Sequence, residues 1–405
     1  MCRLFTFLLA TCALLVPTSV VVAGQVLVAD RLTNSVYRYS ETGALLGTVL
    51  TDSVNLNQAT GIAISPDRAK LYVSSFQGGK VIRYDYNFAL GTASNPMVFA
   101  TAGLASPNAI RFSQDGNTIY VSNLGGTGVA QFNTNGSSAG PSINGPVGDP
   151  VPMAPPGTTD IFQFSGLAFA PTGELLVGGF QNFPGGDKGA IAKSDSAITT
   201  ISNFIGPSAS LNGASGLLVH EDYLYVSSMF ASNIQRFNVT TGAVDPSFTI
   251  SGLTFPQDLV AAPDGTGFLA GILGFTDGTG NIARYGFDGT LLGTFAQSGQ
   301  GGFSEATAIT VISPLLPGDF DNDGAVDAAD LAVWQNNYGE TGNAAYLLGD
   351  GDGDGDTDGR DFLVWQRQYG TTAELSALQS SLVPEPSAAI ILFTAIASLG
   401  VRIRA

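Results

Sequence analysis

Two clusters of aspartates near the C-terminal end carry the clearest chemical pattern in this sequence. Residues 319–330 read DFDNDGAVDAAD and residues 350–361 read DGDGDGDTDGRD, and both fit the pattern D-x-D-x-D-G-x-x-D-x-x-[DE]. Carboxylates at alternate positions of a tight loop converge on one point, and Ca²⁺ takes about six to eight oxygen ligands. Gly324 and Gly355 stand where such a loop bends sharply. Both segments are therefore predicted to be calcium loops.

Each predicted loop supplies six ligand residues, so two Ca²⁺ ions are expected. In the first loop the ligands are the side chains of Asp319, Asp321, Asp323 and Asp330, the backbone carbonyl of Ala325, and Asp327 through a water molecule. In the second loop they are the side chains of Asp350, Asp352, Asp354, Asp358 and Asp361 and the backbone carbonyl of Asp356. A plain acidic linker explains residues 349–359, but it does not explain a duplicated loop.

A short segment with helical periodicity follows each loop. The apolar residues repeat at i, i+3 and i+7, and a glycine then ends each segment; the residues are Leu331, Trp334, Tyr338 and Gly339, and Phe362, Trp365, Tyr369 and Gly370. This duplicated loop–helix arrangement, residues 318–370, resembles the type I dockerin module. The resemblance implies two bound Ca²⁺ ions and docking onto a cohesin-like partner. Dockerins commonly have a Ser/Thr-type pair at the tenth and eleventh loop positions, where this chain has Ala328-Ala329 and Gly359-Arg360, so a structural or surface-association role is the alternative.

The charge distribution narrows the classes of partner. The chain has 405 residues and a net charge of −17, and residues 318–370 alone hold 12 acidic and 2 basic residues. No basic patch is available to neutralise phosphates, which argues against binding to nucleic acid. Both cysteines, Cys2 and Cys12, lie at the extreme N-terminus. The rest of the chain therefore has no disulfide, thiolate metal site or cysteine nucleophile.

Both ends of the chain contain predicted targeting segments. Residues 1–23 combine Arg3, an apolar core and a small-residue cleavage site, which is typical of a secretory signal peptide. After a spacer, residues 371–382, residues 383–405 read VPEPSAAIILFTAIASLGVRIRA. This tail has a Pro-Glu-Pro start, an apolar run that predicts a transmembrane helix, and a basic end, and it resembles the PEP-CTERM sorting signal of bacterial exosortase substrates. The resemblance implies export, transient membrane anchoring, processing by an exosortase-type enzyme, and delivery to the cell envelope, surface or extracellular matrix.

The region between the leader and the acidic loops is built from one repeated unit. Its clearest copy, residues 109–124, reads AIRFSQDGNTIYVSNL, and similar copies start at residues 61, 166, 216 and 258. Alternating apolar runs around an Asp-Gly turn predict a β-hairpin; a third strand follows each copy, and a fourth usually comes next. Residues 25–50 lack a first strand, and residues 307–313 form a first strand with nothing after it. Residues 24–313 are therefore predicted to be an all-β six-bladed β-propeller whose last blade joins both ends, with residues 314–317 as a linker.

The residues leading into each first strand should line the axial channel of such a ring. They are Thr60, Asn108, Ser165, Ser215, Gln257 and Thr307. One step later Asp258 takes a place that other blades give to Gly or Ala, so Asp258 and Asn108 are the candidate catalytic residues. Loops after the second strands should gather on one face, with Phe183, Phe230 and Phe275 near their tips, where the rings either stack on a sugar or peptide or cap the ends of the sheet core. The lone histidine, His220, is expected in a turn on the rim, away from this mouth.

The repeated unit resembles NHL-type and gluconolactonase-like six-bladed domains. That resemblance implies a divalent metal held near the axis by two acidic side chains and an amide, whereas the channel series offers one carboxylate, Asp258, and the amides Asn108 and Gln257. The favoured hypothesis is therefore a non-catalytic binding or assembly platform for a glycan or peptide. The alternative is a metal-dependent propeller hydrolase or lactonase that acts on carbohydrate-type substrates in polysaccharide catabolism. A structural spacer without a ligand is a third possibility.

Overall fold

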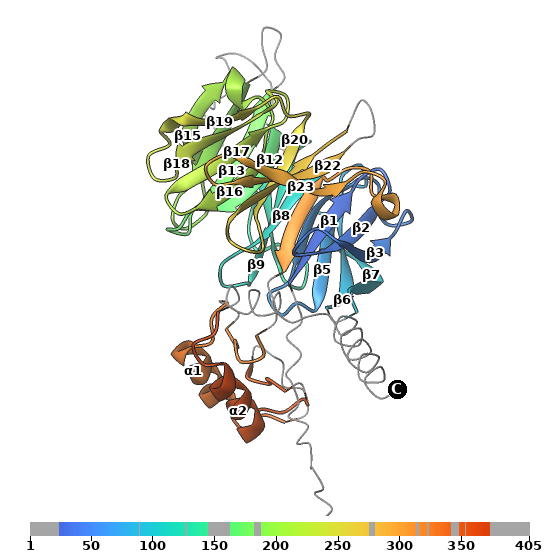
Figure 1. Ribbon diagram of the computed structural model, residues 1–405, viewed down its shortest axis with the longest axis vertical. Coiled ribbons are helices and arrows are strands. Elements are labelled where there is room, and N and C mark those ends of the chain that lie inside the picture. The colour runs from blue at the N-terminus through green and yellow to red at the C-terminus, as the bar shows by residue number, and fades with distance from the viewer. Residues whose placement is uncertain are drawn as a thin grey trace, which may run out of the picture.

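The computed structural model describes residues 24–88, 90–125, 128–144, 163–181, 188–274, 280–312, 316–321, 324–341, 348–352 and 354–372. Within them the chain forms six antiparallel four-stranded sheets, which are the blades of a propeller (Figure 1). The first strand of each blade contacts the first strands of both neighbouring blades, so the ring is closed. The predicted all-β six-bladed propeller is confirmed.

The strands follow the repeat of the sequence. Blade 1 contains β4 (Ala59–Ile64), β5 (Lys70–Ser75), β6 (Lys80–Asn87) and β7 (Thr92–Ala100), and blade 2 contains β8 (Pro107–Phe112), β9 (Thr118–Asn123), β10 (Gly128–Asn133) and β11 (Ile143–Asn144). Blade 3 contains β12 (Gln163–Phe169), β13 (Leu175–Gln181), β14 (Lys188–Ser194) and β15 (Ile201–Ser208), followed by the short helix η1 (Ala209–Leu211). Blade 4 contains β16 (Ala214–His220), β17 (Tyr223–Ser228), β18 (Asn233–Asn238) and β19 (Val244–Ser251).

Both ends of the propeller sequence meet in one blade. Blade 5 contains β20 (Pro256–Ala261), β21 (Gly267–Ile272), β22 (Asn281–Gly286) and β23 (Leu291–Gln297), followed by η2 (Gln300–Gly302). Blade 6 has the order β24 (Ala308–Ile312), β1 (Gln25–Asp30), β2 (Ser35–Ser40) and β3 (Leu45–Thr51). Val26 pairs with Val311, and Leu27 with Thr310. The predicted joining of both ends in one blade is correct.

The hydrophobic core lies between neighbouring blades. One buried cluster joins Leu27 and Val36 of blade 6 to Ile62 and Val73 of blade 1, and other clusters join further pairs of neighbouring blades in the same way. Alternation along each strand places side chains on both faces of its sheet, so a blade in a closed ring is covered on both faces. Fourth strands are more exposed; in β7, for example, only the last two residues are buried.

Glycine is required where first strands come close together. A Cβ atom on Gly61 would lie 1.8 Å from the carbonyl oxygen of Asn108 in the next blade, and one on Gly166 would lie 2.3 Å from that of Ser215. A side chain at either position would push two blades apart. This explains the glycine at both of these positions.

One predicted position differs in the structure. His220 ends strand β16 instead of standing in a turn, and its ring stacks on Phe287 with centroids 3.5 Å apart and an interplanar angle of 4°. It is therefore a packing residue. The fourth strand of blade 2 is the two-residue β11, and residues 145–162 lie outside the described part of the chain.

After the propeller come two helices, α1 (Ala328–Asn337) and α2 (Gly359–Gln368). Each begins with a capping box: Asp327 and Asp330 cap α1, and Asp358 and Asp361 cap α2. No helix in the described ranges is long and apolar enough to cross a membrane. The predicted signal peptide, residues 1–23, and the predicted sorting tail, residues 383–405, fall outside those ranges.

Candidate axial pocket and candidate metal centres

A pocket of about 250 Å³ opens at one end of the propeller channel. Its floor contains five of the six residues expected there, Thr60, Asn108, Ser165, Gln257 and Thr307. Its wall contains residues at the ends of the second strands or just after them, namely Phe76, Leu124, Phe180, Met229, Phe230 and Leu273. The sequence pattern therefore predicted this mouth pocket correctly, because each blade presents the same two chain positions to the axis.

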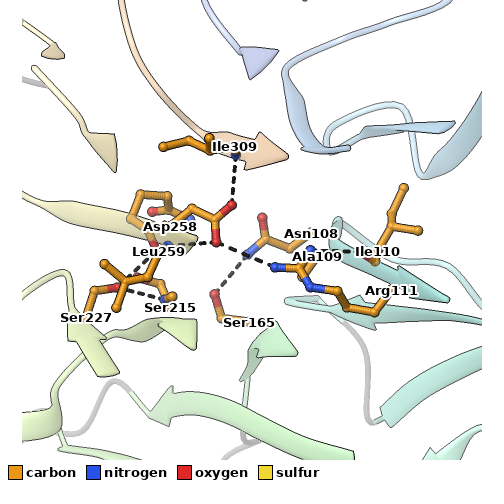
Figure 2. Close-up of polar contacts among 12 residues, drawn as sticks. Asn108, Ala109, Ile110, Arg111, Ser165, Ser215, Ser227, Asp258, Leu259 and Ile309 are labelled. Carbon is orange, nitrogen blue, oxygen red and sulfur yellow. Dashed lines mark hydrogen bonds and ion pairs between the residues drawn. The ribbon is translucent and has the colours of Figure 1, made fainter. Parts of the chain in front are cut away.

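Most of the six polar residues that precede or begin the first strands bind one blade to the next. The Thr60 hydroxyl donates to the Pro107 carbonyl oxygen at 3.0 Å, and the Ser215 hydroxyl donates to that of Pro256 at 3.2 Å. Asn108 Nδ2 donates to Ser165 Oγ at 2.8 Å, as Figure 2 shows, and the Thr307 hydroxyl donates to the Ala59 carbonyl oxygen at 2.8 Å. We call these contacts the inter-blade belt. Their first role is to hold the ring closed.

Asp258 belongs to this belt. Its Oδ1 accepts from the backbone N–H of Leu259 at 2.9 Å, and its Oδ2 accepts from that of Ile309 in blade 6 at 2.9 Å (Figure 2). Arg111 Nη2 lies 3.7 Å from Oδ1. Burial raises the pKa of this carboxyl group, while Arg111 and the two backbone donors act in the opposite direction. Both oxygens are thus engaged by the protein, which suits a structural anchor better than a metal ligand or an exposed base.

Sequence reasoning missed Arg111, the cation beside Asp258. The equivalent first-strand positions of the other blades hold the uncharged residues Ala63, Ala168, Leu218, Val260 and Thr310. Aligning the blades would have revealed this single charged exception. A second missed pair lies at the mouth: Arg31 donates through Nε to the buried carboxylate of Glu305 at 2.6 Å. Because residues 31 and 305 come from opposite ends of the propeller sequence, no local pattern connects them.

One of the three predicted aromatic tips can be placed. Phe230 is 43% exposed, lies in the mouth pocket and meets Phe180 edge-to-face with centroids 5.3 Å apart. Phe183 and Phe275 lie outside the described residues.

Two polar side chains of the pocket remain available to a ligand. Gln163 and Gln257 both line the pocket, and their side-chain amides make no hydrogen bond with the described residues.

The first acidic loop brings together three of its predicted ligands. Carboxylate oxygens of Asp319, Asp321 and Asp330 lie within 4.8 Å of one another. The loop is shaped by its own backbone: Gly324 N–H donates to Asp319 Oδ2 at 3.0 Å, and Asp321 N–H donates to Asp330 Oδ1 at 3.1 Å. Asp327 caps helix α1, and Asp323 lies outside the described residues. The set of hard oxygen donors fits Ca²⁺.

The second loop repeats this geometry. Asp350, Asp352 and Asp361 gather their carboxylate oxygens within 4.8 Å, and Asp356 and Asp358 form a further group with Asp361. Burial and the neighbouring carboxylates raise the pKa of Asp352. The Asp356 carboxylate is an addition, since only its backbone carbonyl was predicted as a ligand; its Oδ1 is buried and makes no hydrogen bond with the described residues. A cation at this point would relieve the crowding of negative charge.

The remaining predicted ligands have separate positions. The Asp354 carboxylate lies 3.3 Å from Arg360 Nη1 at the exposed side of the second loop. Ala325 forms an isolated β-bridge with Thr372, and Asp356 forms one with Thr341. Ala325 and Asp356 are the two residues whose backbone carbonyls are predicted to bind the ions. Each is held by a β-bridge to the segment that follows the helix of the other repeat.

Each helix also supports the loop of the other repeat. The Trp365 indole N–H in α2 donates to the Asp327 carbonyl oxygen at 2.7 Å, and the Trp334 indole N–H in α1 donates to that of Asp358 at 2.8 Å. Asp327 and Asp358 occupy the same position of the two loops. The two candidate metal centres are thus connected through reciprocal hydrogen bonds.

Replacing Trp365 with Phe tests this connection. We expect calcium affinity at the first loop to fall by about tenfold, because outer contacts orient the loop that binds the ion, while the second loop keeps its ligands. Calorimetric titration of calcium into the full chain measures both sites. Tyr338→Phe is the control, since Tyr338 is 61% exposed. A loss confined to the second loop would contradict the cross-repeat contact.

The comparisons with known proteins establish architecture. No family model matches the sequence, and no curated protein matches it. The similarity to a chain of a nidogen–laminin complex covers 72% of this chain and 98% of that chain, with 13% sequence identity and a TM-score of 0.52. The similarity to the Pseudomonas aeruginosa periplasmic gluconolactonase PpgL covers 72% of this chain and 99% of that chain, with 14% sequence identity and a TM-score of 0.48. The similarity to Agrobacterium tumefaciens regucalcin, a calcium-binding protein, covers 60% of this chain and 75% of that chain, with 12% sequence identity and a TM-score of 0.42.

What these proteins share with the chain is the propeller fold. Identities of 12 to 14% show the fold alone. The chemistry of the pocket has to be argued from its own residues.

Proposed function

We propose that the mouth pocket of the propeller binds a small, neutral, polyhydroxylated ligand of the sugar type. The observation that carries the proposal is the combination of two side-chain amides, Gln163 and Gln257, that have no hydrogen-bond partner among the described residues, with the exposed ring of Phe230 in one pocket of about 250 Å³. Amides can pair with hydroxyl groups, and an aromatic ring can cover the apolar face of a sugar. A concave site with an apolar wall and a few convergent polar groups is the usual form of a small-molecule site.

The charges around the pocket support a neutral ligand. Arg31 is the one charged residue among its described lining residues, and Glu305 holds it at 2.6 Å. Asp258 lies deeper in the channel, in a narrow section with a volume of about 10 Å³. Both of its carboxylate oxygens accept hydrogen bonds from backbone N–H groups. A strongly charged ligand would find no separate counter-charge here, whereas hydroxyl groups would find several donors and acceptors.

Hydrolysis of a sugar lactone is the second candidate for the same pocket. The polyhydroxylated character of a sugar lactone suits the polar floor, and the fold is shared with a gluconolactonase. The described floor offers no pair of free carboxylates for a hard metal ion, so a lactonase here would have to polarise the lactone carbonyl with neutral donors such as Asn108.

Titration of the full chain with glucose, followed by ligand-observed NMR, tests the binding proposal. Gln163→Leu and Phe230→Ala are each expected to weaken binding by about tenfold, because each removes one set of contacts worth roughly 1–2 kcal/mol. Leu291→Ala, at a residue that is 61% exposed on β23, is the control and should change nothing. No binding of any sugar-type ligand, or binding unaffected by both pocket variants, would overturn the proposal.

Acid release from glucono-δ-lactone, with and without a divalent cation, separates the two candidates. Turnover above the uncatalysed rate that falls in Asn108→Ala would establish a hydrolase. Binding without turnover would leave the pocket as a receptor site.

For the C-terminal region we propose a calcium-dependent docking module of the dockerin type. The support is the duplicated set of carboxylate clusters and the reciprocal tryptophan contacts. In this proposal two Ca²⁺ ions fix the loops, and the chain is exported and held at the cell surface or in the extracellular matrix, where a cohesin-like or other surface partner binds residues 318–370. Detection of the protein in the envelope fraction after expression with its own residues 1–23 tests the location.

A further inference from the structure

The far end of the propeller channel contains a second pocket that the proposed function does not use. Its volume is about 390 Å³, against about 250 Å³ at the mouth. It is lined by the later residues of the first strands, among them the partly exposed Phe112, Phe169 and Val219. We call it the far pocket. It is mainly apolar in its side chains, in contrast to the polar mouth.

The two pockets are separated by a constriction. The narrow section between them has a volume of only about 10 Å³, and Arg111 and Asp258 are among its lining residues. A space of this size holds roughly one water molecule. A ligand cannot pass through it unless Arg111 moves, so the ends of the channel are two separate sites.

Arg111 is the only charged side chain among the described residues that line the far pocket. Its Nη1 donates to the Ile110 carbonyl oxygen at 2.9 Å, and its Nη2 is 3.7 Å from Asp258, longer than a hydrogen bond. A guanidinium group has five N–H donors, and this one is 28% exposed. Asp258 meanwhile accepts from two backbone N–H groups. Arg111 therefore keeps donors for an anion that enters from the far side.

We propose that the far pocket binds a small organic monocarboxylate with an apolar body. The carboxylate pairs with Arg111, since the planar guanidinium fork matches a carboxylate in two parallel hydrogen bonds. The apolar body lies against Phe112, Phe169 and Val219, where its burial removes apolar surface from water. A sugar would leave hydroxyl groups unpaired on this wall, so the far pocket and the mouth pocket select different ligands.

Calorimetric titration of the full chain with sodium hexanoate, and with 1-hexanol as an uncharged match of equal length, tests this assignment. Hexanoate is expected to bind at least about tenfold more tightly than hexanol, because a hydrogen bond between two charged groups is stronger than one to a neutral hydroxyl group. Arg111→Gln is expected to reduce hexanoate affinity by the same factor. Val219→Glu leaves the Arg111–Asp258 contact in place but puts a negative charge on the wall, so it should weaken hexanoate binding and affect hexanol less. Phe230→Ala, in the mouth pocket, is the control and should leave hexanoate binding unchanged.

The possible outcomes decide the question. The proposal is overturned if hexanoate does not bind, if hexanol binds equally well, or if neither far-pocket variant changes the affinity. Should Arg111→Gln fail to fold, Val219→Glu alone decides. A loss of hexanoate binding in Phe230→Ala would place the ligand at the mouth and would also overturn it. Failure of sugar binding at the mouth has no bearing on this result.

Discussion

Asp361→Asn is expected to abolish calcium binding at the second loop and leave the first loop able to bind. Asp361 is completely buried, belongs to both carboxylate groups of its loop, and accepts from the backbone N–H groups of Gly351, Asp352 and Asp358 at 2.7 to 3.1 Å. Asparagine keeps a similar shape but loses the charge that a hard cation needs. We expect the affinity of that loop to fall by about 100-fold or more.

Calorimetry and tryptophan fluorescence together measure this effect. Calorimetry should show the calcium stoichiometry fall from two to one, and the fluorescence of the only two tryptophans, Trp334 and Trp365, should report on the helices alone. Glu340→Gln removes the same charge from an exposed residue outside the carboxylate groups and is the control. If the unmodified chain binds no calcium and a chelator leaves its fluorescence unchanged, the calcium centres do not exist. If Asp361→Asn still binds two ions, Asp361 is not a ligand.

Asp258→Ala is expected to reduce the free energy of unfolding by about 2–5 kcal/mol, because each of two backbone N–H groups left without an acceptor costs about 1–3 kcal/mol. The substitution leaves Arg111 without its carboxylate and leaves the N–H groups of Leu259 and Ile309 without acceptors. Asp258→Asn should cost less, because its amide oxygen still accepts one of these bonds. Urea unfolding followed by far-ultraviolet circular dichroism is the suitable measurement, since both tryptophans lie outside the propeller.

Asp85→Ala provides the matched control. Asp85 makes an ion pair with Lys70 at 2.6 Å, but its side chain is 46% exposed, and exposed pairs contribute little. Its loss should scarcely move the urea midpoint. If Asp258→Ala unfolds at the same urea concentration as the parent chain, the anchoring role is wrong. A folded Asp258→Ala that loses lactone turnover would instead make Asp258 a catalytic residue.

The sequence predicted the propeller because the repeated information is local. The alternation of apolar residues determines strands, and the Asp-Gly turns determine hairpins. Five hairpin copies and two incomplete ends leave a closed ring of six as the arrangement that pairs every strand. The same reasoning located the mouth pocket, because symmetry brings the same blade position to the axis. It also found the acidic loops, where all the ligands lie within twelve residues.

The sequence by itself therefore determined the strands, the number of blades, the closing blade and the paired acidic loops. Only the tertiary structure decided what the polar residues contact. The partner of Asp258 is Ile309, 51 residues away, and Arg31 and Glu305 are 274 residues apart. The backbone pattern follows from neighbouring residues, whereas a side chain's hydrogen-bond partner depends on where distant segments meet. For that reason Asp258, expected to be a candidate for chemistry, is an anchor between blades, and the far pocket beside Arg111 was not foreseen.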